Sequence, residues 1–219
     1  MLKLRIKYPL TNNIIFNLKD TFNLKDNNLL MEISKEKFEV DNIASCIQTH
    51  SDYVQYIDKP GIYENTDGLI TNVKNNIYLM IQTADCVPIF ILDNNKGIIG
   101  LVHSGWKGTS KSIILSAISI FSDYGSNIND IHVYLGPCIK SCCYEVKSDV
   151  AQFFKEDFIT QNNNKLFLSL ESKIKSDLLN IGIQNSNILI AEVCTYENKK
   201  FCSYRRDKDK AGRMYSIIG

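Results

Sequence analysis

Hydrophobic and polar positions follow a period of two, or form short apolar runs, along much of the chain. This pattern predicts strands over residues 44–49, 68–71, 77–83, 87–92, 98–103, 131–135 and 188–191. Leu4, Ile6 and Tyr8 alternate in the same way, and residues 29–33 are a further strand candidate. The run at 87–92 is continuously apolar, which is typical of a strand buried on both faces.

Three segments have apolar positions at the helical spacing of about 3.6 residues. Their apolar positions are Ile113, Ile114, Ala117, Ile118 and Phe121; Val150, Phe153, Phe154 and Phe158; and Leu170, Ile174, Leu178 and Ile181. Gly108-Thr109-Ser110 is expected to open the first helix and Ser148 to cap the second, while Gly182 ends the third. Strands and helices intermix over residues 1–219, which predicts a single α/β domain: a mixed β-sheet with helices on both faces.

A turn at residues 93–97 joins two of the predicted strands into a hairpin. If its two turn residues are Asn94 and Asn95, Cys86 falls opposite His103, with Cβ atoms about 5 Å apart. That separation suits two ligands of one zinc ion, and His50, just after another strand, is the best third ligand. A fourth position left open for water or substrate is the catalytic pattern of zinc sites.

Other interpretations of the same residues stay open. Cys86 could be a small buried hydrophobe, because free cysteine is often used in that way. Cys86 and His103 could also be the nucleophile and base of a metal-free cysteine hydrolase. A third alternative is a binding module that zinc merely stabilises.

Charge and length exclude several classes of function. The 219 residues include 25 basic and 24 acidic side chains, a net charge of +1, so no nucleic-acid partner is expected. No apolar run approaches the ~18 residues of a membrane helix, and the N-terminus lacks the apolar segment of a signal peptide. We therefore expect a cytoplasmic protein that does not interact with membranes, with its seven cysteines reduced.

The remaining cysteines and histidine give weaker signals. Cys138, Cys142 and Cys143 have C-x3-C spacing, not the C-x2-C of zinc ribbons. Cys142 and Cys143 would face opposite ways in an extended chain, so we expect neither a second metal nor a disulfide there. His132 alternates with apolar neighbours and is expected to be an ordinary strand residue. With only three histidines, the chain cannot ligate several copper centres.

Arginine is rare before the end of the chain. The chain has four arginines: Arg5, and then Arg205, Arg206 and Arg213 within its last fifteen residues. Arginine binds phosphate and carboxylate bidentately, and the helix start near Lys107 offers backbone N–H groups close to His103. An anion site is one interpretation, and a solvated basic tail is the other.

Four ordered motifs carry a resemblance to a known family. They are Thr83-Ala84-Asp85-Cys86-Val87-Pro88; Val102-His103-Ser104-Gly105-Trp106-Lys107-Gly108; Gly136-Pro137-Cys138-Ile139 with Cys143-Tyr144-Glu145-Val146; and Phe201-Cys202-Ser203-Tyr204-Arg205-Arg206 with Gly212-Arg213. Over residues 44–219 the chain resembles the laccase-domain, multicopper-polyphenol-oxidase-like family, also described as a purine nucleoside phosphorylase family. Residues 1–43 diverge, because the family's usual Arg- and Gly-rich stretch is missing there.

The resemblance implies a three-layer α/β/α fold and one zinc ion, with copper as the other candidate metal, held by His50, Cys86 and His103. It implies phosphorolysis of adenosine, inosine and methylthioadenosine, and deamination of adenosine. The expected partners are thus a purine nucleoside and phosphate, the phosphate lying near Lys107, Arg205, Arg206 or Arg213, in a monomer or homodimer. Polyphenol oxidation and editing of peptidoglycan precursors are the other activities connected with the family. Asp85, next to a ligand, is expected to be a turn or supporting residue and not the catalytic acid.

Overall fold

The computed structural model describes residues 2–8, 11–18 and 40–219, with side chains from residue 40 onward. Leu4, Ile6 and Tyr8 lie in strand β1, as expected. The expected strand at residues 29–33 lies outside the described residues.

A six-stranded mixed sheet forms the centre of the molecule, in the order β14-β10-β8-β9-β6-β4. Its strands are β4 (Val54–Tyr56), β6 (Gly68–Asn72), β8 (Val87–Asp93), β9 (Ile98–Ser104), β10 (Ile131–Leu135) and β14 (Ile188–Ile190). The β10–β14 and β4–β6 pairs are parallel and the others antiparallel. Every residue of β8 and β9 is buried, which confirms the prediction from the apolar run.

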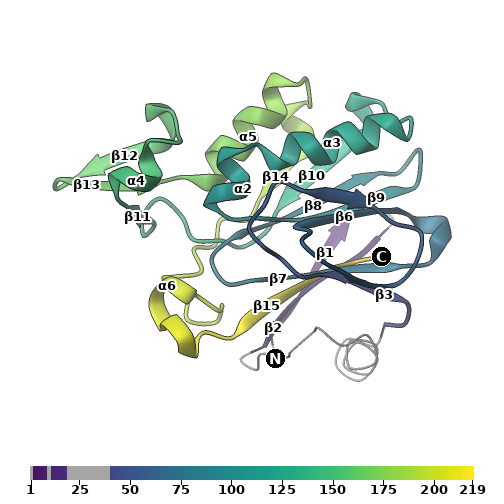
Figure 1. The fold of residues 1–219 in the computed structure, drawn as a ribbon, viewed down its shortest axis with the longest axis horizontal. Helices are drawn as coiled ribbons and strands as arrows, with labels where there is room; N and C mark the ends of the chain where they lie inside the picture. Colours follow the sequence, from purple (N-terminus) through teal and green to yellow (C-terminus); the bar gives the residue numbers. More distant parts are fainter. Residues whose placement is uncertain (1, 9–10, 19–39) are drawn as a thin grey trace.

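Helices cover one face of this central sheet (Figure 1). They are α2 (Trp106–Ser110), α3 (Ile113–Asp123) and α5 (Leu170–Asn180). The predicted apolar stripe of α3 is buried, but the single helix expected after Gly108 is two helices, separated at Ser112 by a backbone φ of 58°. None of the helices in the described part of the chain is both long and apolar enough to cross a bilayer.

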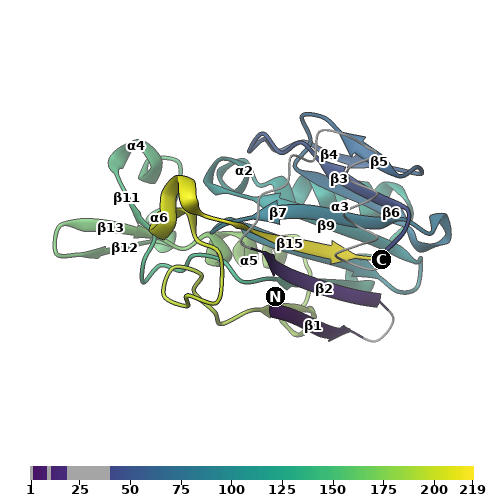
Figure 2. The same ribbon diagram turned by 90° about the horizontal axis from the view of Figure 1, so that it is seen from below.

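A second six-stranded sheet covers the other face of the central sheet (Figure 2). In the order β1-β2-β15-β7-β3-β5, it contains β1 (Leu2–Tyr8), β2 (Thr11–Leu18), β3 (Ile43–Cys46), β5 (Gly61–Tyr63), β7 (Tyr78–Thr83) and β15 (Arg213–Ile218). Leu79 and Ile81 of β7 share one buried cluster with Phe90 and Leu101 of the central sheet. The α/β class is confirmed, but in the described residues a sheet stands where helices were expected. Alternation reveals that a face is buried and not which kind of element covers it.

A small three-stranded sheet, in the order β11-β13-β12, projects from one end of the molecule beside α4 and α6 (Figure 1). These elements are β11 (Glu145–Val146), α4 (Ser148–Ala151), β12 (Ile159–Asn162), β13 (Lys165–Leu168) and α6 (Tyr204–Asp207). The helix predicted over residues 148–158 is wrong in length, because α4 ends at Ala151. Ser148 is also not its cap; Lys147 occupies that position, without a side-chain hydrogen bond.

Candidate metal centre and adjoining pocket

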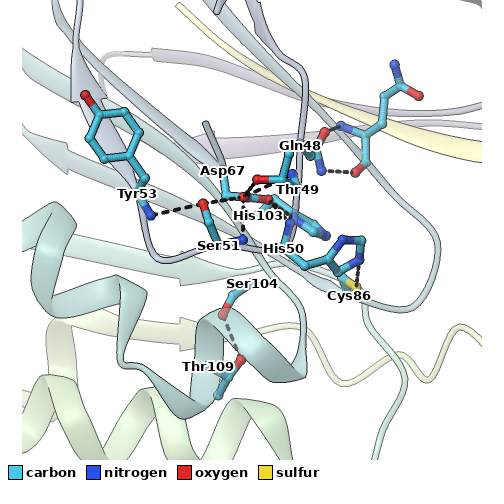
Figure 3. A network of polar contacts seen from close by, with 11 residues as sticks. Gln48, Thr49, His50, Ser51, Tyr53, Asp67, Cys86, His103, Ser104 and Thr109 are labelled. Carbon is cyan, nitrogen blue, oxygen red and sulfur yellow. Dashed lines mark hydrogen bonds and ion pairs between the residues drawn. The ribbon is translucent and has the colours of Figure 1, made fainter. Parts of the chain in front are cut away.

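Three side chains from separate parts of the chain converge at one end of the central sheet (Figure 3). His50 follows β3, Cys86 immediately precedes β8, and His103 lies in β9. Their ligand atoms all lie within 4.8 Å of one another, and Cys86 Sγ is 4.0 Å from His50 Nε2. The two imidazole rings are nearly perpendicular, with centroids 4.7 Å apart. His103 is buried whereas His50 is exposed, so the cluster is reached from solvent at His50.

The hairpin that carries Cys86 and His103 has a different register from the one expected. Its turn has four residues, 94–97, so Pro88 pairs with His103. The expected pairing of Cys86 with His103 is therefore wrong by two positions. A shift of two preserves the face on which each side chain lies, whereas a shift of one reverses it. Cys86 and His103 consequently still meet, as diagonal neighbours.

In this register Gly105 lies opposite Cys86. A Cβ atom at residue 105 would lie 3.0 Å from Cys86 Sγ and 2.9 Å from His50 Cδ2. Any side chain there would displace two of the three converging groups. Glycine thus keeps open the space in which an ion would be held.

Asp67 organises the site, and the sequence analysis missed it. Its buried carboxylate accepts from His103 Nδ1 at 2.8 Å and from the His50 backbone N–H at 3.0 Å. It also accepts from the N–H and hydroxyl groups of both Thr49 and Ser51. The bond to Nδ1 turns His103 Nε2 toward Cys86, an arrangement that fixes ring and tautomer in many metal sites. Asp67 immediately precedes β6, and no periodic or motif signal marks it.

The electrostatics of the cluster favour a thiolate. Burial raises the pKa of Cys86, but the neighbouring His103 and His50 outweigh burial and lower it to about 6. Burial lowers the pKa of His103, but the Cys86 thiolate and the Asp67 carboxylate together raise it to about 9. Asp67 is also buried, yet hydrogen bonds from His103 and Ser51 hold its pKa well below its usual range. Without a metal, these shifts favour a thiolate–imidazolium pair backed by a carboxylate.

A cavity of about 440 Å³ lies near the cluster, although His50, Cys86 and His103 are not among its lining residues. Its wall includes Trp106, which follows Gly105, and Tyr144 and Arg205, whose guanidinium lies 5.0 Å from the Tyr144 ring centroid. Lys147 and Lys208 add positive charge and Glu145 and Asp149 add negative charge, and neither lysine was singled out in the sequence. A spacing argument could not find them, because the small sheet and α6 bring them together from distant segments.

Asp85 connects this pocket to the cluster. Its backbone has a φ of 88°, and its buried carboxylate accepts from Thr195 Oγ1 at 2.7 Å and from the Arg205 backbone N–H at 2.6 Å. In this structure Asp85 supports its neighbours, because its carboxylate binds Thr195 and the Arg205 backbone. Because Cys86 follows Asp85 in sequence, this hydrogen bond fixes the position of the Arg205 backbone relative to Cys86.

The four basic residues expected to bind an anion have different environments. Arg205 lines the pocket, and its Nη1 donates to the Glu145 carbonyl. The guanidinium of Arg206 is engaged elsewhere, in five hydrogen bonds to the Asp207 carboxylate and to backbone carbonyls. Arg213 donates to two backbone carbonyls and Lys107 is exposed beside Trp106; neither lines the cavity. Only Arg205 of the four is therefore placed for an anion in this pocket.

Comparison with known proteins gives the family. Residues 11–219 match the family described as multi-copper polyphenol oxidoreductase laccase. The chain belongs to this family. The match begins at residue 11 and therefore includes part of the segment that was expected to diverge.

Relatives and solved structures agree with this assignment. A purine nucleoside phosphorylase of Clostridium acetobutylicum is 37% identical over 213 residues, which cover 94% of this chain and 82% of the relative. Adenosine deaminase RL5, from an unknown prokaryotic organism, is 29% identical over 199 residues, covering 82% and 76%. The crystal structure of the Bacillus licheniformis hypothetical protein YfiH has a TM-score of 0.87 at 26% identity, covering 99% of this chain and 96% of that one. The single-domain α/β fold is thereby confirmed.

The residues of the cluster fit one metal ion. Two imidazoles and a thiolate are donors that zinc accepts, and copper shares a preference for them. Gly105 leaves the space between them free, and Asp67 orients one of the rings. The family description names several coppers, but the chain has only three histidines, and His132 lies apart from the other two in β10.

Proposed function

We propose that this protein is a zinc-dependent purine nucleoside phosphorylase that cleaves adenosine, inosine and methylthioadenosine, and that it also deaminates adenosine. The observation that carries the proposal is the convergence of His50, Cys86 and His103 near a cavity lined by aromatic and charged side chains, with basic residues in excess. The names of the relatives supply the reaction class.

His50, Cys86 and His103 would hold the ion, leaving one position open toward solvent at His50. Zinc bound to this donor set supplies Lewis-acid chemistry, either on a phosphate oxygen or on water. The role of Asp67 is to keep the proton of His103 on Nδ1, so that Nε2 stays available for the ion.

The adjoining cavity has the chemistry that a nucleoside and phosphate need. Trp106 and Tyr144 offer aromatic surfaces for a purine, and Arg205 offers a fixed guanidinium for phosphate. Burial, together with the nearby Cys86, raises the pKa of Tyr144, so its phenol stays protonated at neutral pH. Tyr144 is thus a hydrogen-bond donor available to the substrate.

In phosphorolysis a phosphate oxygen forms a bond to ribose C1′ while the C1′–N9 bond to the purine breaks. The electron pair of the broken bond leaves with the purine, which takes up a proton or strong hydrogen bonds. Arg205 would position the phosphate, and Tyr144 would donate a hydrogen bond to the bound substrate. In deamination, water replaces the amino group at purine C6 and ammonia leaves.

HPLC of the products from inosine and adenosine tests the proposal. We expect hypoxanthine from inosine only when phosphate is present, and inosine from adenosine with or without phosphate. If metal-loaded protein releases no hypoxanthine in either condition, the phosphorylase function is refuted. If it nevertheless converts adenosine to inosine, only the deaminase function is retained.

A second candidate function rests on the thiolate–imidazolium pair. Cys86 with a pKa of about 6, beside His103 with a pKa of about 9, resembles the activated nucleophile of a cysteine hydrolase. Such an enzyme would work without metal, and alkylation of Cys86 would inactivate it in the presence of a chelator. The phosphorylase would already be inactive after chelation.

A further inference from the structure

A second cluster of potential ligands lies outside the centre described above. The sulfur atoms of Cys142, Cys143 and Cys194 and a carboxylate oxygen of Glu197 all lie within 4.8 Å of one another. Cys142 and Cys143 do not face opposite ways, as was expected for an extended chain, because residues 141–143 form a turn and the two Sγ atoms are 3.2 Å apart. That separation exceeds the 2.03–2.05 Å of a disulfide bond, and all three thiols are free.

Two tight turns present these groups to each other. In one, the Tyr144 N–H donates to the Lys140 carbonyl, and in the other the Asn198 N–H donates to the Cys194 carbonyl. Burial raises the pKa of Cys194, but backbone hydrogen bonds from Lys140, Glu197 and Tyr196 lower it below the usual thiol value. Outer hydrogen bonds of this kind orient metal-bound thiolates. Backbone groups of both turns therefore stabilise the Cys194 thiolate.

The four side chains of the cluster differ in their exposure to solvent. Cys194 is buried, Cys143 is half-buried, and Cys142 and Glu197 are exposed. An ion could enter past the exposed pair and be held against the buried sulfur. Three sulfurs and one carboxylate provide four ligands, which is the number that a closed, tetrahedral structural zinc site requires.

The first turn leads directly into the wall of the candidate pocket, and the second contacts Asp85, which holds the Arg205 backbone. Tyr144 follows Cys143 and lies under Arg205, while Thr195 follows Cys194 and donates to Asp85. The bond from the Thr195 N–H to the Cys138 carbonyl joins the two loops through the backbone. An ion bridging Cys143 and Cys194 would cross-link segments about fifty residues apart in sequence, which limits the freedom of both.

We infer that Cys142, Cys143, Cys194 and Glu197 form a second, structural zinc site that fastens these two loops together. The site is separate from His50, Cys86 and His103, so it can exist whether or not the proposed function is correct. Soft thiolate ligands select zinc and cuprous ions over magnesium or calcium.

Zinc content of protein purified under reducing conditions tests this inference. We expect two zinc ions per chain in the wild type, one in Cys142→Ser/Cys194→Ser and one in Cys86→Ala. The zinc that remains in Cys142→Ser/Cys194→Ser should be lost when Cys86→Ala is added. The zinc that remains in Cys86→Ala should be lost when Cys194→Ser is added. One zinc ion in the wild type, retained in Cys142→Ser/Cys194→Ser, would overturn the inference.

A more conservative substitution tests the same site with less risk that the variant misfolds. Glu197→Gln keeps the shape of the side chain but weakens a ligand, and Glu192→Gln changes an exposed carboxylate outside the cluster. We expect only Glu197→Gln to lose one zinc equivalent to a chelator more readily, with faster hydrogen exchange at residues 140–144 and 194–198. Equal zinc retention by both variants, or a disulfide among the three cysteines in protein alkylated at lysis, would overturn the inference.

Discussion

The Asp67 carboxylate accepts six hydrogen bonds, from Thr49, His50, Ser51 and His103. It therefore holds the loop that carries one proposed ligand and the imidazole of another. We expect Asp67→Asn to weaken zinc binding at this centre by about 10- to 100-fold, the usual effect of removing a partner of a metal-bound histidine. Competition with a colour-forming chelator measures this affinity.

Asp52→Asn is the control for Asp67→Asn, because Asp52 is exposed and pairs with Lys111 at the surface. Its zinc affinity should match the wild type. If both variants retained wild-type affinity while remaining folded by circular dichroism, the supporting role of Asp67 would be refuted.

The adjacent residues Arg205 and Arg206 should behave differently on substitution. Arg205 lines the cavity, so Arg205→Ala should raise the KM for phosphate about tenfold, the effect of one lost charge-assisted hydrogen bond, more than it raises the KM for inosine. The guanidinium of Arg206 is bound to Asp207 and to backbone carbonyls. Arg206→Ala should therefore lower the free energy of unfolding by about 1–3 kcal/mol.

Steady-state kinetics and urea unfolding of these two variants separate the roles. A larger phosphate KM effect for Arg206→Ala than for Arg205→Ala would contradict the assignment. Neighbours in sequence give no hint of this difference, because it depends on which carbonyls lie near each guanidinium.

Single residues were predictable from sequence only where motif and spacing agreed. Cys86 and His103 could be paired because a hairpin restricts the possible partners, and an error of two positions left them on the same face. Asp67 could not be found, because it contacts His103 from 36 residues away and belongs to no motif. The cluster around Cys194 was missed for the same reason, since it combines two distant turns.

The β8–β9 hairpin determines the relative position of Cys86 and His103, and its turn depends on Gly97. That residue has a φ of 66°, and a Cβ atom there would lie 2.9 Å from Val73 Cγ2. We expect Gly97→Ala to lower the free energy of unfolding by about 1–2 kcal/mol, because side chains are disfavoured in left-handed backbone. Urea denaturation measures the change.

Lys96→Ala is the matched control, because Lys96 is exposed in the same turn. Its stability should stay within about 0.5 kcal/mol of the wild type, as for most surface substitutions. If Gly97→Ala were as stable as this control, the turn would not require its left-handed conformation.

Elements with strong periodicity were predictable, and those defined by tertiary partners were not. The apolar stripe of α3 and the runs of β8 and β9 were correctly identified, because their side chains are buried along a complete face or on both faces. The helix expected after Ser148 stops at Ala151, and a hairpin of β12 and β13 follows. Phe153, Phe154 and Phe158 were interpreted as a helical stripe, but Phe153 is exposed beside Trp106, whereas Phe154 and Phe158 pack against the main buried cluster.

At the scale of the whole molecule, two sheets and a helical layer bring the ends of β8 and β9 to the same place as the loop after β3 (Figures 1 and 3). The small sheet and α6 then close the cavity beside that place. The length of the chain and its intermixed strand and helix patterns predicted one α/β domain, but not the second sheet. Its β15 lies almost 200 residues from β2, with which it pairs.

The central claim is that catalysis depends on an ion held by His50, Cys86 and His103. The most direct test is inosine phosphorolysis by chelator-treated protein during titration with zinc. We predict that treated protein is inactive, that activity returns and saturates with zinc, and that Cys86→Ala stays folded but inactive throughout. Full phosphorolysis by treated protein before zinc is added, or by Cys86→Ala, would contradict the account.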